Sequence, residues 1–225
     1  MSRVGITSDR FDDIAPCYVD AGLDPVALPC IRIDPAPPPV MADARREAAN
    51  ADLLVVTSPR VVSLLWPDGR MPPVRTAAVG PSTASSVERA GGAVAIVGDA
   101  GLARLVDLLA DRVAGRRVLI AHAEGSDPEA MRRLRDLVPE FEEQLVYRTV
   151  PLPPAADSVD AVSFASPSAV TGWTLTRGFD DLIVGVIGDT TAAAVARYRT
   201  ADIVSEQATH LALAGAIASF MEVNV

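Results

Sequence analysis

Four short segments of the sequence place hydroxyl side chains where a helix is expected to begin. Each follows a short apolar run and contains serine or threonine beside proline or glycine. The start of a helix presents unpaired N–H groups and a partial positive charge, which bind carboxylates or phosphates. Alternatively, the hydroxyls serve only as helix N-caps. Taken together, the four turns favour a polyanion site. They are Thr57-Ser58-Pro59-Arg60, Gly80-Pro81-Ser82-Thr83, Ser166-Pro167-Ser168 and Gly188-Asp189-Thr190-Thr191.

The residue patterns of most other enzyme classes are absent from the sequence. Every basic residue is arginine, so no lysine can form a Schiff base or occupy a phosphate-binding loop. There is no Gly-x-Ser-x-Gly elbow and no Gly-x-Gly-x-x-Gly fingerprint after the first apolar run. Cys17, Cys30, His122 and His210 lack the spacings of metal sites, so we expect neither a metal nor a cofactor. We expect His122 at a strand end and His210 on the surface, at the start of the last helix.

Composition limits the partners of the chain. Its 225 residues are 49% hydrophobic and 22% charged, which suits one large domain or two small ones. The net charge of −9 argues against binding nucleic acid or an anionic membrane. No apolar run reaches the ~18–20 residues of a membrane span, and no signal peptide is evident. We therefore expect a cytoplasmic monomer with reduced thiols, a Cys17–Cys30 disulfide being the alternative.

An internal repeat organises the chain. Residues Asp52–Pro59 match Asp160–Pro167, since each segment has an aspartate, a short apolar run and then Ser-Pro. The same offset of 108 positions aligns Ala78–Ala84 with Val186–Ala192. Because one register holds across several motifs without a gap, we infer a duplicated structural unit.

Short apolar runs alternate with alanine-rich segments along both repeats. Runs of four or five apolar residues without alternation predict strands that are covered on both faces, as in a parallel sheet. Alternating strands and helices predict a doubly wound α/β fold. The expected strands are Val4–Thr7, Leu53–Val56, Thr76–Val79, Val94–Val97, Val118–Ala121, Val162–Phe164, Ile183–Ile187 and Ile203–Ser205. The helices include Asp13–Ala21, Ser82–Ala90, Pro128–Leu137 and Thr190–Tyr198, and the hydroxyl residues that open two of them are expected to cap.

Two proline-rich stretches predict the domain boundaries. Residues 34–39 and 149–154 follow the strand-like segments Pro25–Ile33 and Gln144–Tyr147 and are expected to be extended linkers. They isolate residues 40–148 as one domain and leave 1–33 plus 155–225 as a discontinuous one. The prediction is therefore two flavodoxin-like, doubly wound parallel-sheet domains joined by a two-stranded linker.

The order of the turns resembles that of the uroporphyrinogen-III synthase family over nearly the whole chain. The matching motifs are Thr57–Arg60, Val79–Ala84, Val146–Thr149, Phe164–Ser168 and Ile187–Ala192. The resemblance implies two α/β domains with the active site in the cleft between them. It also implies a lyase of tetrapyrrole and haem biosynthesis that works without metal or cofactor. Such an enzyme converts hydroxymethylbilane, a linear tetrapyrrole with eight carboxylates, to uroporphyrinogen III.

The resemblance also assigns roles to residues. Tyr147 is the candidate proton donor to the leaving hydroxyl, with aromatic packing at the hinge as the alternative. The sequence departs from the family pattern at Ser8, Glu124 and Asp189. The alternative function is a non-catalytic module that senses a tetrapyrrole or another anion. The candidate substrate-binding residues are Thr57, Ser58, Arg60, Gly80, Ser82, Thr83, Ser166, Ser168, Gly188, Thr190 and Thr191.

Overall fold

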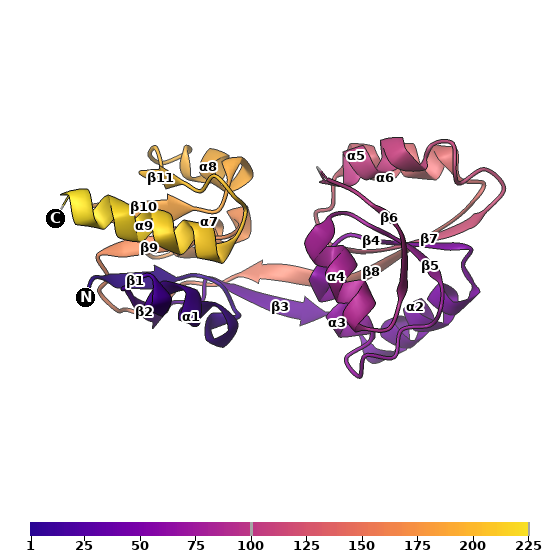
Figure 1. Cartoon of the computed structure of the whole chain (residues 1–225), viewed down its shortest axis with the longest axis horizontal. Coiled ribbons are helices and arrows are strands. Elements are labelled where there is room, and N and C mark those ends of the chain that lie inside the picture. Colours follow the sequence, from indigo (N-terminus) through magenta and orange to yellow (C-terminus); the bar gives the residue numbers. More distant parts are fainter. Residues whose placement is uncertain (100, 225) are drawn as a thin grey trace. The chain divides into compact units, whose positions relative to one another are not determined.

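The chain divides into two compact units, each built on one β-sheet. The computed structural model describes residues 1–99 and 101–224 (Figure 1). Unit 1 comprises Met1–Ile33 and Thr149–Val225, and unit 2 comprises Asp34–Arg148. Unit 1 is therefore discontinuous, because all of unit 2 lies between its two segments in the sequence.

Unit 1 is a doubly wound sheet with the strand order β11-β10-β9-β1-β2, and its neighbouring strands are parallel. Numbered within the unit, this is the flavodoxin-like order 2-1-3-4-5. Helices α1 and α9 share a buried core with β1, while α7 and α8 pack with β9 and β10. The strands are β1 (Arg3–Ile6), β2 (Asp24–Ala27), β9 (Ala161–Phe164), β10 (Ile183–Val186) and β11 (Ile203–Val204). The helices are α1 (Phe11–Asp20), α7 (Pro167–Trp173), α8 (Asp189–Val195) and α9 (His210–Asn224).

Unit 2 carries the sheet β3-β8-β7-β4-β5-β6, in which the strands from β8 to β6 pair in parallel. Helices α5 and α6 share a buried core with β4 and β7, while α3 packs against both α2 and α4. The strands are β3 (Ile31–Pro35), β4 (Leu53–Val56), β5 (Arg75–Ala78), β6 (Ala93–Val97), β7 (Arg117–Ala123) and β8 (Glu140–Pro151). The helices are α2 (Pro38–Asn50), α3 (Pro59–Leu65), α4 (Pro81–Arg89), α5 (Gly101–Leu109) and α6 (Pro128–Leu137). The α/β class expected from the sequence is confirmed.

The two sheets share one strand order, although unit 2 is formed by one continuous segment of the chain and unit 1 by two. The order β8-β7-β4-β5-β6 in unit 2 corresponds to β2-β1-β9-β10-β11 in unit 1. Equivalent aspartates bind the strand beside them: Asp52 Oδ2 accepts from Arg117 N (2.9 Å) and Asp160 Oδ2 from Arg3 N (2.8 Å). In unit 1 the contact between Arg3 and Asp160 joins the two sequence segments that make up this unit. The first two strands of each repeat therefore lie in the sheet of the other repeat: β1 and β2 pair with β9–β11, and β7 and β8 pair with β4–β6.

The proline-rich stretches are more regular than the sequence suggests. The predicted strand Pro25–Ile33 is two strands, β2 and β3, which belong to different sheets. Helix α2 was not predicted, and it begins at Pro38 because proline is tolerated in the first helical turn. Strand β8 continues to Pro151. It runs opposite to β3: Ala36 N donates to Val146 O and Leu152 N donates to Cys30 O, both at 2.8 Å.

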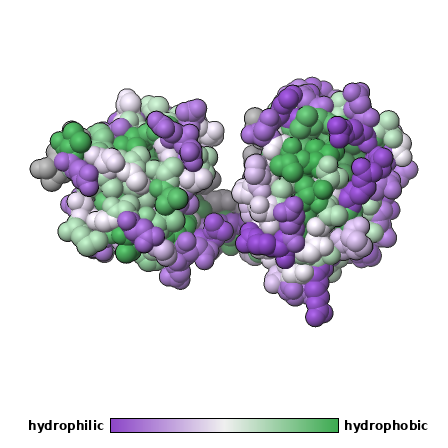
Figure 2. Space-filling view, viewed as in Figure 1, coloured by the Kyte–Doolittle hydropathy of each residue, from purple (hydrophilic) through white to green (hydrophobic). Residues whose placement is uncertain are grey.

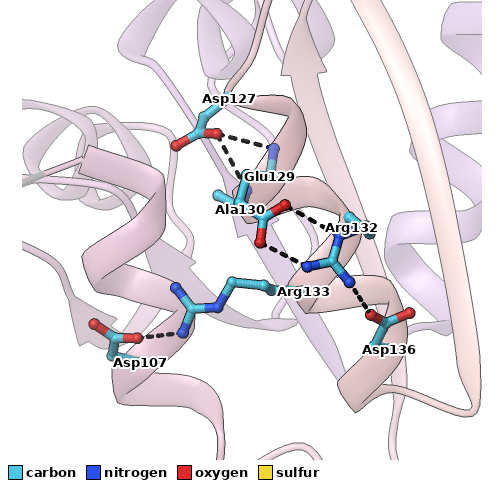
Figure 3. Close-up of polar contacts among 7 residues, drawn as sticks. All are labelled: Asp107, Asp127, Glu129, Ala130, Arg132, Arg133 and Asp136. Carbon is cyan, nitrogen blue, oxygen red and sulfur yellow. Dashed lines mark hydrogen bonds and ion pairs between the residues drawn. The ribbon is translucent and has the colours of Figure 1, made fainter.

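An ion pair links α6 to α5 on the surface of unit 2 (Figure 3). The Asp127 carboxylate caps this helix by accepting from the backbone N–H groups of Glu129 and Ala130, at 3.0 and 3.2 Å. Arg133 reaches Asp107 of α5, and this guanidinium lowers the pKa of the Asp107 carboxyl. Both side chains are exposed, so solvent weakens this interaction.

Strand β6 forms one edge of the unit 2 sheet and is apolar throughout. Ala93, Ala95 and Val97 are exposed, and Figure 2 shows hydrophobic side chains gathered at this strand. Among the described residues, no helix has the length and apolarity needed to span a membrane.

Candidate active site

The candidate residues of unit 2 meet at the carboxyl edge of its sheet. Strands β4, β5 and β7 are parallel neighbours, so the turns that follow β4 and β5 lie at the same edge. Tyr147 of β8 reaches this edge as well, because it pairs with Ala123 at the end of β7. Ligands of open α/β sheets bind at this edge.

Tyr147 contacts the turn that follows β4. Its phenol oxygen lies 3.2 Å from Ser58 Oγ, and the residue is only 8% exposed. The Arg60 guanidinium carbon lies 6.0 Å from the centroid of the Tyr147 ring. A phenol that hydrogen-bonds to a hydroxyl near a cation can donate a proton to a departing group.

A β-bulge sets the position of Tyr147. His122 pairs with Leu145 but the next residue, Ala123, pairs with Tyr147, so Val146 is an extra residue in β8. Bulges change the direction in which a side chain points. The Tyr147 carbonyl then accepts a hydrogen bond from Glu124 N at 3.0 Å. The loop after β7 thereby fixes the backbone of Tyr147.

The turn after β5 begins α4 without a hydroxyl cap. Gly80 is the N-cap residue, and no side chain caps this helix. Ser82 is exposed, whereas Thr83 is 1% exposed. The expectation that a hydroxyl opens this helix as a cap is therefore wrong, because extended glycine occupies the capping position. The Ser82 hydroxyl is left available to a ligand.

The carboxyl edge of the unit 1 sheet repeats this arrangement. Ser166 caps α7 by accepting from Ala169 N at 3.2 Å, as Ser58 caps α3 by accepting from Val61 N at the same distance. Gly188 is the N-cap of α8, again without a side-chain cap. The expected hydroxyl cap of α8 is therefore also wrong.

Exposure separates the hydroxyls of these unit 1 turns. Thr190 is exposed and Ser168 half-buried, whereas Thr191 is 3% exposed. Thr190 and Ser168 are consequently the hydroxyls that a ligand can reach most directly.

His122 is buried at the end of β7, as its place after an apolar run predicts. Its Nε2 lies 3.1 Å from Glu143 Oε1, and its Nδ1 lies 2.9 Å from the Ala123 carbonyl oxygen. Glu143 also pairs with Arg135 at 2.7 Å. Glu143 of β8 thus contacts both His122 of β7 and Arg135 of α6. Within residues 1–99 and 101–224, no three His, Cys, Asp or Glu side chains cluster closely enough to hold a metal.

Comparisons with known proteins identify the family. The model of the family "Uroporphyrinogen-III synthase HemD" matches residues 12–215. The chain belongs to this family. Uroporphyrinogen-III synthases are lyases, so the chain is an enzyme of the tetrapyrrole pathway. The search of curated proteins gives no match.

Solved uroporphyrinogen-III synthases share the fold. A triple mutant of the Thermus thermophilus enzyme has 20% identity and a TM-score of 0.66, over 100% of this chain and 99% of that one. The Helicobacter pylori enzyme has 15% identity and a TM-score of 0.69, with the same coverage. At these identities the likeness shows the fold alone.

The structure brings some of the residues expected of a uroporphyrinogen-III synthase into contact and leaves others in separate units. Ser58, Arg60 and Tyr147 are neighbours in unit 2, and the Thr57 hydroxyl lies 3.5 Å from the Ala121 carbonyl oxygen. The turns that contain Ser166 and Gly188 belong to unit 1. That these turns face those of unit 2 across one cleft stays a prediction.

His210 departs from its expected exposure. It begins α9, is half-buried, and its Nδ1 is buried without a hydrogen-bond partner. Its ring lies 6.5 Å from that of Tyr18, which is fully buried. Burial lowers the pKa of His210, and the charge of Arg10 lowers it further. Burial also raises the pKa of Tyr18, to about 12.

We expect the low pKa of His210 to make this uroporphyrinogen-III synthase sensitive to mild acid. In the unfolded chain histidine titrates near 6.5, so below this pH the unfolded state binds more protons than the folded state. The free energy of unfolding should fall as pH decreases from about 6.5. His210→Gln removes this titration and should flatten the curve. Urea unfolding between pH 7 and pH 5 gives the free energy of unfolding of the parent chain and of His210→Gln. If the two free energies depend on pH in the same way, the prediction is wrong.

Proposed function

We propose that this chain converts hydroxymethylbilane to uroporphyrinogen III, with Tyr147 as the proton donor to the terminal hydroxyl. The observation that carries the assignment of Tyr147 is its position at the carboxyl edge of the unit 2 sheet. There its phenol oxygen lies 3.2 Å from Ser58 Oγ and its ring is near the Arg60 guanidinium. No other tyrosine has this setting, since Tyr18 of α1 is fully buried in unit 1, and Tyr198 is also in unit 1 and is 58% exposed.

The first step breaks the bond between the terminal carbon and its hydroxyl. Tyr147 gives its phenol proton to this oxygen, which leaves as water with the electron pair of the bond. The lone pair of the adjoining pyrrole nitrogen forms a C=N bond, the ring double bonds shift to give the new exocyclic double bond, and a cationic azafulvene results. The enzyme then holds a phenolate near that cation, so the two charges balance.

The second step is mainly one of positioning. The substituted carbon of the last pyrrole attacks the azafulvene and forms a spiro intermediate, which opens and recloses with that ring inverted. Ring closure releases one proton, which restores the Tyr147 phenol, so that water is the net loss. Holding the flexible linear tetrapyrrole in the conformation that reacts accounts for much of the rate in such a reaction.

The turns at the carboxyl edges of both sheets supply hydrogen-bond donors and a cation for the eight carboxylates of hydroxymethylbilane. Exposed and half-buried hydroxyls and loop amides can donate to them, and Arg60 adds a cation. Asp189 introduces an opposing charge in the turn after β10. We propose as substrate-binding residues Thr57, Arg60, Gly80, Ser82, Thr83, Ser166, Ser168, Gly188, Thr190 and Thr191.

The composition of the product tests the proposed reaction directly. Hydroxymethylbilane generated in place is given to the purified chain, and the type I and type III uroporphyrinogens are separated after oxidation. We expect type III to dominate, because the spontaneous closure without protein gives type I. If only type I forms, at the rate of the protein-free control, the proposed activity is wrong.

The cysteines bear on where the reaction takes place. Cys17 and Cys30 are both unpaired thiols, and burial raises the pKa of Cys30 to about 12. Unpaired buried thiols are typical of reducing compartments. We propose that the chain works in the cytoplasm, as a monomer.

A further inference from the structure

Ser58 has two contacts that together leave little of its hydroxyl for the substrate. Its Oγ accepts the Val61 N–H at 3.2 Å, which caps α3, and it also lies 3.2 Å from the Tyr147 phenol oxygen. Ser58 is half-buried. These contacts favour a role of Ser58 beside Tyr147 over the substrate-binding role that the family resemblance implies.

The contact with Tyr147 changes character during the proposed reaction. While the phenol keeps its proton, either oxygen can donate to the other. Once that proton has gone to the leaving hydroxyl, only Ser58 can donate, and its acceptor is then an anion. Hydrogen bonds to an ionised partner are about twice as strong as neutral ones. The contact therefore strengthens as charge develops, and interactions of that kind accelerate a chemical step.

We propose that Ser58 is the positioning residue of Tyr147: it fixes the phenol and stabilises the phenolate that remains after proton transfer. This inference rests on the proposed function. No atom of Ser58 has to touch the substrate, so Ser58 acts through Tyr147. Arg60, close to the ring of the same tyrosine, favours the same charge.

The equivalent serine of unit 1 shows what capping alone requires. Ser166 has nearly the same backbone angles as Ser58, and its cap distance of 3.2 Å is the same. All three tyrosines of the sequence are described; Tyr147 is hydrogen-bonded to Ser58, and none of the three is hydrogen-bonded to Ser166. Capping a helix after a Ser-Pro turn therefore does not need a tyrosine. Of the two capping serines, the tyrosine contact is specific to Ser58.

The kinetic test separates positioning from substrate binding. We expect Ser58→Ala to lower kcat about tenfold or more and to leave KM within about twofold, since the lost bond is strong only in the charged state. Ser58→Thr keeps the hydroxyl and the cap and should restore most of kcat. A raised KM with unchanged kcat would mean that Ser58 binds substrate, which overturns the inference.

A double mutant tests whether Ser58 acts through Tyr147. In the Tyr147→Phe background, Ser58→Ala should cause no further loss of kcat, because there is no phenol left to stabilise. Two losses that multiply would overturn the inference. If Tyr147→Phe itself has full activity, the proposed role of Tyr147 fails, which is a different outcome. Asp43→Ala, which removes an exposed ion pair with Arg46 within α2 of unit 2, should leave kcat unchanged.

A spectroscopic measurement tests the contact without any activity. With ¹³C-labelled tyrosine the chain gives signals from Tyr18, Tyr147 and Tyr198. Ser58→Ala should move the Tyr147 signal alone, whereas Ser166→Ala, which loses the matching cap, should leave it in place. An unmoved Tyr147 signal in Ser58→Ala would contradict the contact and overturn the inference.

Discussion

Tyr147→Phe is expected to lower kcat for uroporphyrinogen III by about a hundredfold or more, the usual contribution of a positioned proton donor. The change removes one oxygen and keeps the ring, which is 8% exposed and packs at the end of β7. KM should change little, because a phenol proton matters when the hydroxyl leaves rather than when carboxylates bind. Stopped assays at several hydroxymethylbilane concentrations, with type I and type III products separated, give both constants.

Folding should survive this substitution. Ser58 keeps its bond to Val61 N, and the backbone of Tyr147 keeps its bond from Glu124 N. Tyr198→Phe is the matched control, since it removes the same oxygen from an exposed tyrosine of unit 1. It should leave kcat as in the parent chain. A Tyr147→Phe chain that is folded and fully active would assign the proton transfer to another group.

The sequence predicts the strands better than the boundaries between them. Buried parallel strands are nearly continuous apolar runs, so β4, β7 and β9 are evident. The break between β2 and β3 falls at residues 28–30, where Pro29 is the one local sign of it, because Leu28 and Cys30 on either side are apolar and buried like strand residues. Helix α2 is hidden for a different reason: its prolines are typical of a linker, yet proline also suits the first turn of a helix.

The candidate site was predicted residue by residue but not as a set of contacts. The Ser58–Tyr147 contact joins positions 89 residues apart and depends on the bulge at Val146, for which the sequence has no local pattern. The burial of His210 depends in the same way on Tyr18, which α1 brings from the other end of the chain. Long-range packing determines both the Ser58–Tyr147 contact and the burial of His210, and the internal repeat does not specify that packing.

Gly172, the last residue but one of α7, has the tightest backbone environment among the described glycines. A Cβ at this position would lie 2.0 Å from the Cys30 carbonyl oxygen and 2.6 Å from that of Leu152. Cys30 directly precedes β3 and Leu152 directly follows β8, and Leu152 N donates a hydrogen bond to Cys30 O. Because backbone atoms cannot turn aside as a flexible side chain can, α7 packs at this distance only with glycine.

We therefore expect Gly172→Ala to lower the free energy of unfolding by about 3 kcal/mol or more, at the upper end of the cost of overpacking. Urea unfolding followed by circular dichroism measures the loss. Gly215→Ala is the matched control, since Gly215 also lies within a helix of unit 1 and its Cβ would meet nothing within 4 Å. Alanine there should raise stability by about 0.5–1 kcal/mol, because it restricts the unfolded chain and favours the helix. Equal effects at the two positions would show that α7 tolerates a side chain against the Cys30 and Leu152 carbonyls.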